Sequence, residues 1–212
     1  MVEIIATYDF FPGVDQKAWA ELAKKNIGGL RKAPGFMEFR GNRILLGSPQ
    51  VRTTSVFQTM ADWAKFAQSP EYLALETEGR RFVTNIEAKI WGPSPVVPEP
   101  VRSGQKGTPK VEMAQTFDLL PNIDLKAYGE LSRKVMGLLT KAAGFVEFRA
   151  RRNVLGSPQV LATSAWLTMV DYARFLDSPE WRVLEPEVRT FVANIRVDIW
   201  GPSPVVPEPV RP

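Results

Sequence analysis

The chain has 212 residues, of which 44% are hydrophobic and 24% charged, an ordinary globular composition. It contains no cysteine and no histidine. Disulfides, thiolate nucleophiles and imidazole bases are therefore excluded, and so are the haem, zinc or iron sites that these residues build. We expect no cofactor and no metal. The net charge is +4, and basic residues are interleaved with acidic ones, so we expect no nucleic-acid partner. The sequence shows neither an apolar span nor a signal peptide, so we expect a cytoplasmic protein without a membrane partner.

The chain begins with a strand pattern followed by a helix pattern. Val2 to Phe10 alternates with a period of two and is rich in β-branched and aromatic residues, which predicts a strand. Asp15 is a suitable helix N-cap. Apolar residues at helical spacing then predict a helix that stops at Ala33-Pro34-Gly35. They are Trp19, Leu22, Ala23, Ile27 and Leu30.

Three more strands and a further helical region follow. Phe36 to Arg40 and Gln50 to Phe57 predict two strands that form a hairpin, and Thr84 to Trp91 predicts the last strand. Between them, Thr59-x-x-Asp62 resembles a capping box, and Ser69-Pro70-Glu71 supplies a second helix start. The order strand, helix, strand, strand, helix, strand is the split β-α-β, or ferredoxin-like, arrangement of the α+β class.

The remaining half of the chain repeats the first half. Shifted by 109 positions, residues 2–102 overlay residues 111–211 without a gap, and about 58 of the 101 aligned positions are identical. The intervening residues, 103–110, form a polar Gly/Pro-containing linker. We therefore predict two domains, 1–102 and 111–212, each of the βαββαβ type.

Each repeat leaves one sheet face without helices, and each ends in a Pro-rich arm. Two such units can cover their bare faces by packing sheet against sheet, and duplication makes this pairing intramolecular. The arms, at 91–100 and 200–209, are too rich in proline for a central strand and read as polyproline-type segments. Because they carry the apolar pairs Val96-Val97 and Val205-Val206, we expect each arm to be ordered and to cross the partner unit.

Each repeat resembles the dimeric α+β barrel superfamily, in particular its antibiotic-biosynthesis monooxygenase-like domains. The resemblance lies in a strand that ends in Trp, a short turn, a helix and a Ser-Pro-Glu-aromatic break, as in 162–181; in the first repeat Phe57 replaces that Trp. The resemblance implies a cofactor-free oxygenase of polyphenolic substrates, an isomerase or lyase, or a protein without activity. Haem-degrading members use an axial His, which this chain lacks.

Two kinds of polar residue are candidates for chemistry. A glutamate and an arginine share a face of the second strand, where they could act as proton acceptor and oxyanion-stabilising cation, or simply form an ion pair. They are Glu38 and Arg40, and Glu147 and Arg149 in the second repeat. Asn85 and Asn194 begin the last strands and could polarise a bound carbonyl group, although turn bonding is the alternative.

Several large aromatic residues could stack on a flat ligand, although aromatic residues at helical spacing more often belong to the core. The candidates are Trp63, Tyr72, Trp91, Trp166, Tyr172, Trp181 and Trp200. Phe57, Trp63 and Tyr72 are matched by Trp166, Tyr172 and Trp181, so any pockets in the two repeats should differ in shape and polarity.

Three functions remain open. One is a cofactor-independent monooxygenase acting on a small aromatic molecule, in which the deprotonated substrate itself reacts with oxygen. Another is a non-catalytic small-ligand or scaffold protein, and a third is an isomerase or lyase of the same superfamily. A small aromatic molecule is the expected partner, and self-association beyond the intramolecular pair is an open possibility.

Overall fold

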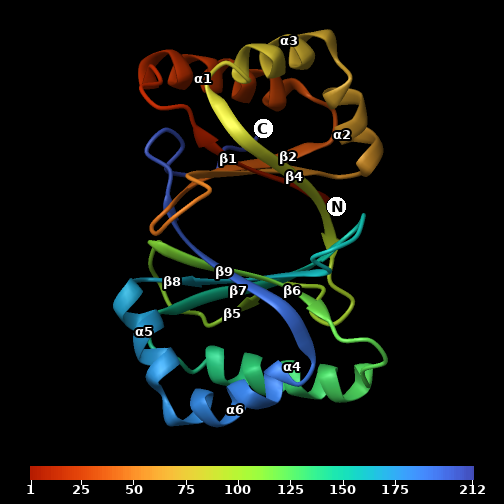
Figure 1. Ribbon diagram of the computed structural model, residues 1–212, viewed down its shortest axis with the longest axis vertical. Helices are drawn as coiled ribbons and strands as arrows, with labels where there is room; N and C mark the ends of the chain where they lie inside the picture. The colour runs from red at the N-terminus through yellow and green to blue at the C-terminus, as the bar shows by residue number, and fades with distance from the viewer. The chain divides into compact units, whose positions relative to one another are not determined.

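The computed structural model describes residues 1–212 and divides into two compact units (Figure 1). The first unit comprises residues 1–92 and 202–212, and the second comprises residues 93–201. Each is an α+β unit with an antiparallel sheet and helices on one of its faces. None of the helices is both long enough and apolar enough to span a bilayer.

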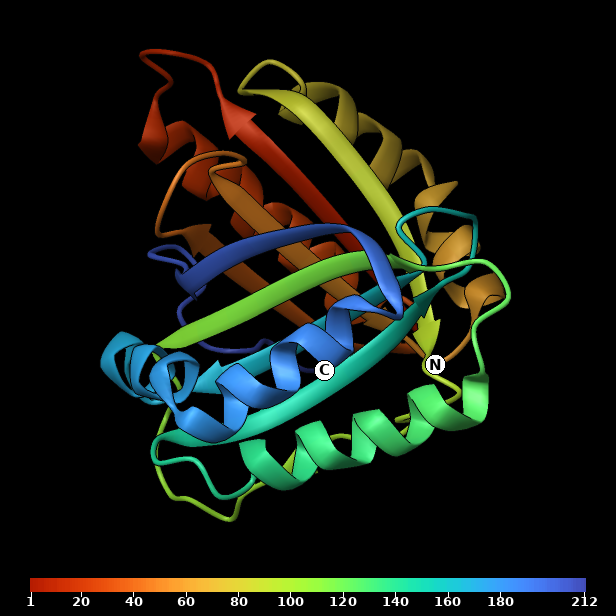
Figure 2. The same ribbon diagram turned by 60° about the horizontal axis from the view of Figure 1, so that its bottom comes forward.

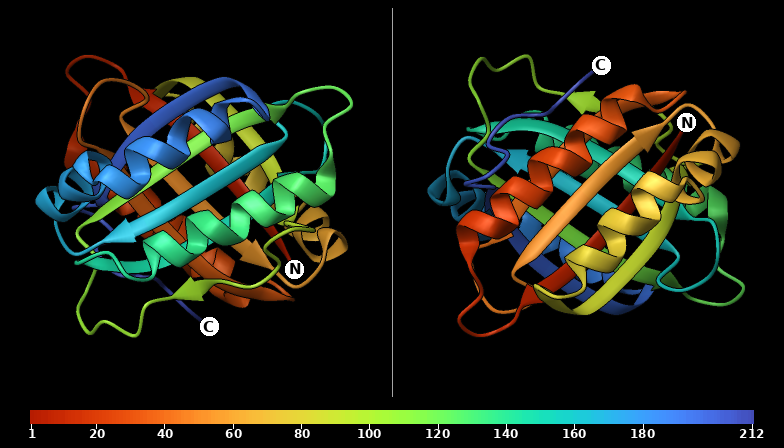
Figure 3. Two further views of the ribbon diagram at one scale, coloured as in Figure 1. Left: turned by 90° about the horizontal axis from the view of Figure 1, so that it is seen from below. Right: turned by 90° about the horizontal axis from the view of Figure 1, so that it is seen from above.

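The sheet of the first unit has the strand order β4-β1-β3-β2. Figure 3, right, shows α1 and α3 lying across it. In chain order the elements are β1 (Val2–Phe10), α1 (Gln16–Lys32), β2 (Phe36–Ile44), β3 (Val51–Phe57), α2 (Met60–Ala67), α3 (Pro70–Gly79) and β4 (Val83–Pro93).

The second unit repeats this order, with strands arranged as β9-β6-β8-β7-β5. Figure 2 and the left view of Figure 3 show α4 and α6 side by side across its strands. Its elements are β5 (Val101–Arg102), β6 (Val111–Leu119), α4 (Leu125–Leu139), β7 (Phe145–Asn153), β8 (Val160–Trp166), α5 (Met169–Asp177), α6 (Pro179–Arg189) and β9 (Val192–Pro202).

Side-chain caps begin the helices where the sequence predicts them. The Asp15 carboxylate accepts hydrogen bonds from the backbone N–H groups of Lys17 and Ala18 at 2.9 and 3.0 Å. Thr59 caps α2 by accepting from Asp62 N–H at 3.1 Å. Ser69 caps α3, so the second helical region is two helices with a break between them. Each cap satisfies a backbone donor that lacks a partner within its helix.

Strand β2 is longer than the sequence pattern predicts, since it continues from Arg40 to Ile44. Gly41 suggests a turn, but Gly41 pairs with Thr53 of β3 and remains in the strand. A Cβ atom on Gly41 would lie 3.1 Å from the Cβ of Ser203, so the glycine permits the close approach of another segment.

Alternation along the strands divides each sheet into two faces. In the first unit Ile4, Tyr8 and Phe39 face the helices, whereas Glu3 and Arg40 lie on the opposite, helix-free face. The core of this unit lies on the helix side, where Leu30, Phe36, Phe39, Phe57 and Val206 are buried together. The corresponding core of the second unit contains Met113, Leu139, Phe145, Trp166, Tyr172 and Phe175.

The Pro-rich arms are exchanged between the repeats. Residues 202–212, which follow the second repeat, belong to the first unit, and residues 93–102 belong to the second unit. Val206 is buried in the first unit's core, and Val101 of β5 pairs with Phe148 of β7. This confirms that the arms are ordered and cross to the partner unit. The compact units therefore differ from the predicted boundaries 1–102 and 111–212, which left each arm with its own repeat.

Candidate functional site

The first unit contains a cavity of about 440 Å³ between its sheet and its helices. This volume lies within the range of about 300–1,000 Å³ that is usual for small-molecule sites. Strand residues form its floor, α1 and α3 form its roof, and residues 203–206 of the exchanged arm close one side. The cavity thus depends on both ends of the chain.

Aromatic side chains form two walls of this cavity. At one wall the rings of Tyr8 and Phe10 contact the indole of Trp19 edge-on, with centroids 5.6 and 5.4 Å apart. At the other wall the rings of Phe66 and Tyr72 lie 4.8 Å apart. Trp63 lines the same space. Flat walls of this kind favour a planar ligand.

Asn26 brings a polar group to the cavity from α1. It follows Trp19 by seven residues, or two helical turns, and therefore lies on the cavity-facing side of the helix. Its side-chain oxygen Oδ1 is buried and has no hydrogen-bond partner. A buried polar atom without a partner costs stability, so its presence in a ligand-sized space points to a bound hydrogen-bond donor.

Two phenols also face the cavity, of which Tyr8 is buried and Tyr72 half-buried. Burial raises the pKa of Tyr8 well above its usual value. The pKa of Tyr72 is also raised, first by burial and then by the negative charge of Glu76, against the opposing charge of Arg80. Both phenols are therefore neutral at physiological pH and act as hydrogen-bond donors or acceptors rather than as bases.

Only one carboxylate lines the cavity, and it is already paired. Arg80 Nε donates to Glu76 Oε1 at 2.6 Å, one helical turn away on α3. The cavity also shares Phe10, Gln16 and Gln50 with a hollow bounded by loop residues, so this end opens toward the surface. No three acidic side chains come together in a way that could hold a metal ion.

The second unit has a cavity of about 410 Å³ in the corresponding place. Its lining includes Trp181 and Tyr128, and residues 94–97 of the other arm. The positions of Tyr8 and Asn26 are taken by Phe117 and Val135. Conversely, Gln115 and Tyr128 take the positions of Ala6 and Trp19, so the two cavities are similar in size and carry their polar groups at different places.

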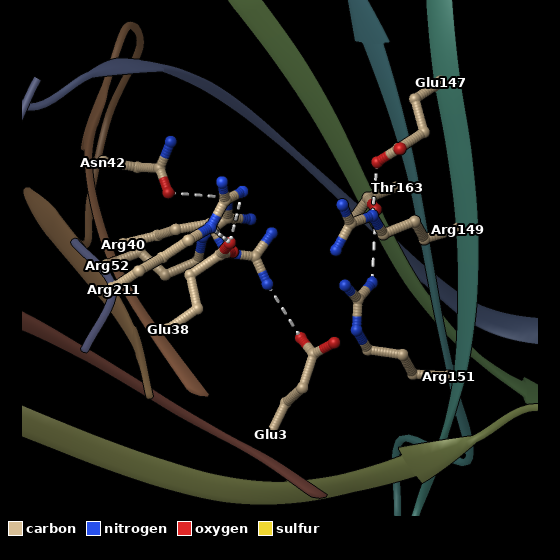
Figure 4. A network of polar contacts seen from close by, with 10 residues as sticks. All are labelled: Glu3, Glu38, Arg40, Asn42, Arg52, Glu147, Arg149, Arg151, Thr163 and Arg211. Carbon is tan, nitrogen blue, oxygen red and sulfur yellow. Dashed lines mark hydrogen bonds and ion pairs between the residues drawn. The ribbon is translucent and has the colours of Figure 1, made fainter. Parts of the chain in front are cut away.

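The predicted Glu38–Arg40 pair lies outside the cavity, on the helix-free face of the first unit's sheet (Figure 4). Arg40 contacts Glu38 Oε1 at 3.0 Å and Glu3 Oε2 at 3.2 Å. Arg211, from the exchanged arm, donates to Glu38 Oε2 at 3.0 Å. The pair thus forms an ionic network that includes the arm, and its catalytic role stays a prediction without support from the cavity.

Glu147 and Arg149 repeat this arrangement in the second unit. Glu147 accepts from Arg149 and, at 2.7 Å, from Arg102 of the exchanged arm. Burial acts to raise the pKa of Glu147, but the hydrogen bonds and charges of Arg149 and Arg102 outweigh it and lower the pKa. An ionised, doubly paired carboxylate is poorly suited to accept a proton.

Asn85 and Asn194 lie away from both cavities, at the start of β4 and β9. Each has a positive φ, 52° and 55° respectively. Their side-chain amides donate to Asp9 and Asp118 at 3.1 and 3.0 Å. These contacts are the turn bonding that was the alternative to carbonyl polarisation.

The predicted aromatic residues fall into two groups. Trp63 and Tyr72 line the first cavity and Trp181 lines the second, so a binding role for these three stays a prediction with suitable geometry. Trp166 and Tyr172 pack together in the second unit's core, with ring centroids 5.6 Å apart. Trp91 lies opposite Glu3 in the pairing of β1 with β4, and Trp200 lies opposite Glu112 in the pairing of β6 with β9. Both tryptophans are therefore on the helix-free faces of the sheets.

The sequence pattern did not single out Tyr8, Trp19 and Asn26 as site residues. Tyr8 and Trp19 fit the strand and helix patterns as ordinary core residues. The available signal was Asn26, a polar residue within the apolar face defined by Trp19 and Leu30.

A family model matches most of the first repeat. Residues 1–77 match the family model described as antibiotic biosynthesis monooxygenase. This part of the chain is therefore similar to an antibiotic biosynthesis monooxygenase domain. The second repeat, identical to the first at about 58 of 101 positions, lies outside this match. No curated protein sequence matches the chain.

Solved structures agree with this assignment at the level of the fold. An anthrone oxidase-like protein is 13% identical, with a TM-score of 0.73 and coverage of 99% of this chain and 92% of its own. A Fusobacterium nucleatum protein provisionally described as a monooxygenase is 5% identical, with a TM-score of 0.71 and coverage of 99% and 94%. A variant chlorite dismutase from Candidatus Nitrospira defluvii is 13% identical, with a TM-score of 0.68 and coverage of 96% and 91%.

These similarities agree with the predicted resemblance to the dimeric α+β barrels, and they confirm the duplicated ferredoxin-like fold. At such low identity they concern the fold of the monooxygenase-type domains. Substrate and activity depend on the residues of the cavities.

Proposed function

We propose that the first unit binds a flat, hydroxylated aromatic molecule in its cavity and oxidises it with molecular oxygen without a cofactor. The observation that carries the proposal is the buried Oδ1 of Asn26, which has no partner and faces a space walled by Tyr8, Trp19 and Tyr72. A substrate hydroxyl would supply the missing hydrogen bond. The monooxygenase-type domain and the fold shared with an anthrone oxidase-like protein support this reaction class.

The substrate would supply the electrons. In an anthrone-type molecule, a CH₂ group conjugated with a carbonyl loses a proton and gives an enolate, which reduces O₂. One oxygen atom becomes a new carbonyl on that carbon, and the other leaves as water with the two hydrogens of the CH₂ group. The protein's part is to bind the ring, exclude water and stabilise the enolate oxygen.

The cavity residues fit these tasks. Neutral Tyr8 or Tyr72 can donate a hydrogen bond to the enolate oxygen, while Asn26 Oδ1 accepts one from a ring hydroxyl. Because Glu76 is paired with Arg80, the substrate proton would pass to water at the open end of the cavity.

Binding without turnover is the second candidate, and the pairing of Glu76 favours it because a dedicated base is missing from the cavity lining. An isomerase or lyase would need such a base, so this geometry gives it less support.

Oxygen consumption tests the proposal. With 2-hydroxyanthrone, whose ring hydroxyl can donate to Asn26 Oδ1, we expect one O₂ consumed per molecule converted to the quinone, and we expect Asn26→Val to lower kcat/KM at least about tenfold. Val135→Ala, in the second cavity, is the matched control and should leave the rate unchanged. Binding of 2-hydroxyanthrone without oxygen uptake would select the second candidate, and absence of binding would reject the proposal.

A further inference from the structure

We propose that the second unit binds an aromatic carboxylate, with the ring inside its cavity of about 410 Å³ and the carboxylate on Arg152 at the open end. The residues that line this cavity all belong to the second unit. The site is therefore separate from the first cavity and does not depend on the reaction proposed there.

The open end of this cavity lies at the tip of the hairpin between β7 and β8. Residues 140–144 join α4 to β7 in a short turn, so the helix and the strand run in opposite directions. Tyr128, in the first turn of α4, therefore lies at the same end of the cavity as Arg152, near the end of β7. Arg152, Gly156 and Gln159 are exposed, so this end opens to solvent.

The inner end of the cavity is apolar. Phe148 of β7, and Val135 and Met136 of α4, line it and pack against the core of the unit. Trp181 packs against the same core, with its ring centroid 5.1 Å from that of Phe175. Flat apolar side chains of this kind favour an aromatic ring.

The charged residues that line this cavity are both arginines. Arg151 is buried and donates to the hydroxyl of Thr163 at 3.3 Å (Figure 4). Arg152 makes no ion pair or hydrogen bond within the chain, so its N–H donors are open to a ligand. Because the lining contains no acidic residue, a ligand carboxylate meets positive charge without an opposing negative charge.

Two acidic residues border this end of the cavity, and both have hydrogen-bond partners other than Arg152. Asp118 accepts from the Ser157 hydroxyl at 2.8 Å and from the backbone N–H of Gln159 at 2.9 Å. Asp124 caps α4 by accepting from backbone N–H groups of the first turn. Arg152 is therefore not the counter-ion of either carboxylate.

Two amides at the open end present donors. Asn153 Oδ1 accepts from the backbone N–H of Leu155, and Gln159 Oε1 accepts from that of Leu119, both at 3.0 Å. With the oxygen atoms turned toward the backbone, the NH₂ groups are the parts left to bind a ligand. Together with Arg152 they favour a ligand group that only accepts hydrogen bonds, as a carboxylate does.

The first cavity repeats only part of this arrangement. Arg43 takes the place of Arg152, but Ile44 stands where the second unit has Asn153. Glu76 also lines the first cavity, and its negative charge opposes a second carboxylate there. We therefore expect the carboxylate site in the second unit.

A neutral polar ligand is the alternative occupant. Gln115, Tyr128 and Ser132 also line the second cavity, and their side chains can bind an amide or a hydroxyl group. A ligand that used these groups alone would not depend on the charge of Arg152.

A matched pair of probes separates the two. 2-Naphthoate and 2-naphthamide share one ring system and have nearly the same shape, and only the first is charged at neutral pH. Calorimetry measures their binding to the full chain and to Arg152→Gln. Arg133→Gln, on the exposed side of α4, removes the same charge outside the cavity, and Arg43→Gln removes it at the equivalent position of the first unit.

A further variant, Val135→Phe, places a ring inside the second cavity. Circular dichroism and thermal unfolding establish that it is folded, and Ala162→Phe, on the floor of the same cavity, replaces it if it is not.

We expect the wild type to bind 2-naphthoate at least about tenfold more tightly than 2-naphthamide, and Arg152→Gln to remove this preference. Arg133→Gln and Arg43→Gln should keep it, and the variant with a filled second cavity should lose 2-naphthoate binding. The proposal is overturned if the amide binds as tightly as the carboxylate, or if Arg152→Gln keeps the preference. It is also overturned if Arg43→Gln removes the preference, or if 2-naphthoate still binds when the second cavity is filled.

Discussion

The backbones of Phe39 and Val210 bind each other in both directions: each N–H donates to the other residue's carbonyl oxygen at 2.8 Å. Phe39 lies in the middle of β2 and also lines the first cavity, while Val210 is close to the end of the chain. The pair therefore ties the arm of the second repeat to the sheet of the first unit.

We expect that deletion of residues 203–212 destabilises the protein by about 1–3 kcal/mol, the value of burying one or two valines. Val206 is buried, so Val206→Ala should account for about 1.5 kcal/mol of this through the loss of two methyl groups. Val205 is 37% exposed, and Val205→Ala is the control with a smaller effect. Urea unfolding provides the measurement, and unchanged stability after the deletion would show that the arm contributes no net binding energy.

Gly35 should tolerate no side chain. Its φ is +71°, and a Cβ atom would lie 2.5 Å from the carboxylate of Asp62, which caps the neighbouring helix with Thr59. Gly13 has a similar φ of +74° but open space around it. We expect Gly13→Ala to lower the free energy of unfolding by about 1 kcal/mol through the backbone conformation alone, and Gly35→Ala to lower it clearly more. Equal thermal shifts for the two variants would contradict the steric argument.

Asn26 should destabilise the ligand-free protein, and a bound ligand should offset this effect. Replacing it by Val removes a buried oxygen without a partner, so we expect Asn26→Val to stabilise the ligand-free protein by about 1 kcal/mol. The reverse change, Val135→Asn, should destabilise the second unit by about 1–3 kcal/mol. Chemical denaturation without ligand measures both, and a destabilised Asn26→Val variant would show that the amide is satisfied in solution.

Stability at acidic pH should depend on Asp118. Hydrogen bonds from Asn194 and Ser157, and from the backbone N–H of Gln159, lower the pKa of its carboxyl group against the effect of burial. Because the folded-state pKa is lower than the unfolded one, this stabilisation is fully present above the unfolded pKa of about 3.9. It is lost as the pH falls through the folded-state value.

Asp118→Asn should therefore lower stability at pH 6 and reduce the further loss between pH 6 and pH 3. Asp9, whose pKa is lowered by Asn85, Ser48 and Gln50 despite the opposing effect of burial, provides the equivalent variant in the first unit. Urea midpoints at the two pH values give the comparison. Parallel curves for the wild type and both variants would exclude these carboxylates as the source of the acid sensitivity.

Packing of the two units sheet against sheet stays a prediction, and small-angle scattering tests it. A single compact body of 212 residues should have a radius of gyration of about 17 Å. Two units that tumble separately would give a distinctly larger value and an elongated distance distribution. The physical reason to expect the compact form is that a sheet with helices on one face needs a cover on the other.

The local elements and the duplication follow from the amino-acid sequence alone. Strands and helix starts depend on residues that are neighbours in the chain, so local patterns predict them. Examples are the period-two alternation in Val2–Phe10 and the caps at Asp15, Thr59 and Ser69. The same holds for the match between the repeats, which predicts two copies of one fold.

Long-range contacts, which the sequence pattern does not reveal, set which unit each arm joins and which strand face lines a cavity. Glu38 and Arg40 share a face in any strand, but that face turned out to lie opposite the helices because Phe39 occupies the helix side. Asn26 became a site residue because the sheet, α1, α3 and the exchanged arm enclose a space beside its Oδ1. Local periodicity carries no information about contacts between segments about 170 residues apart, such as Phe39 and Val210.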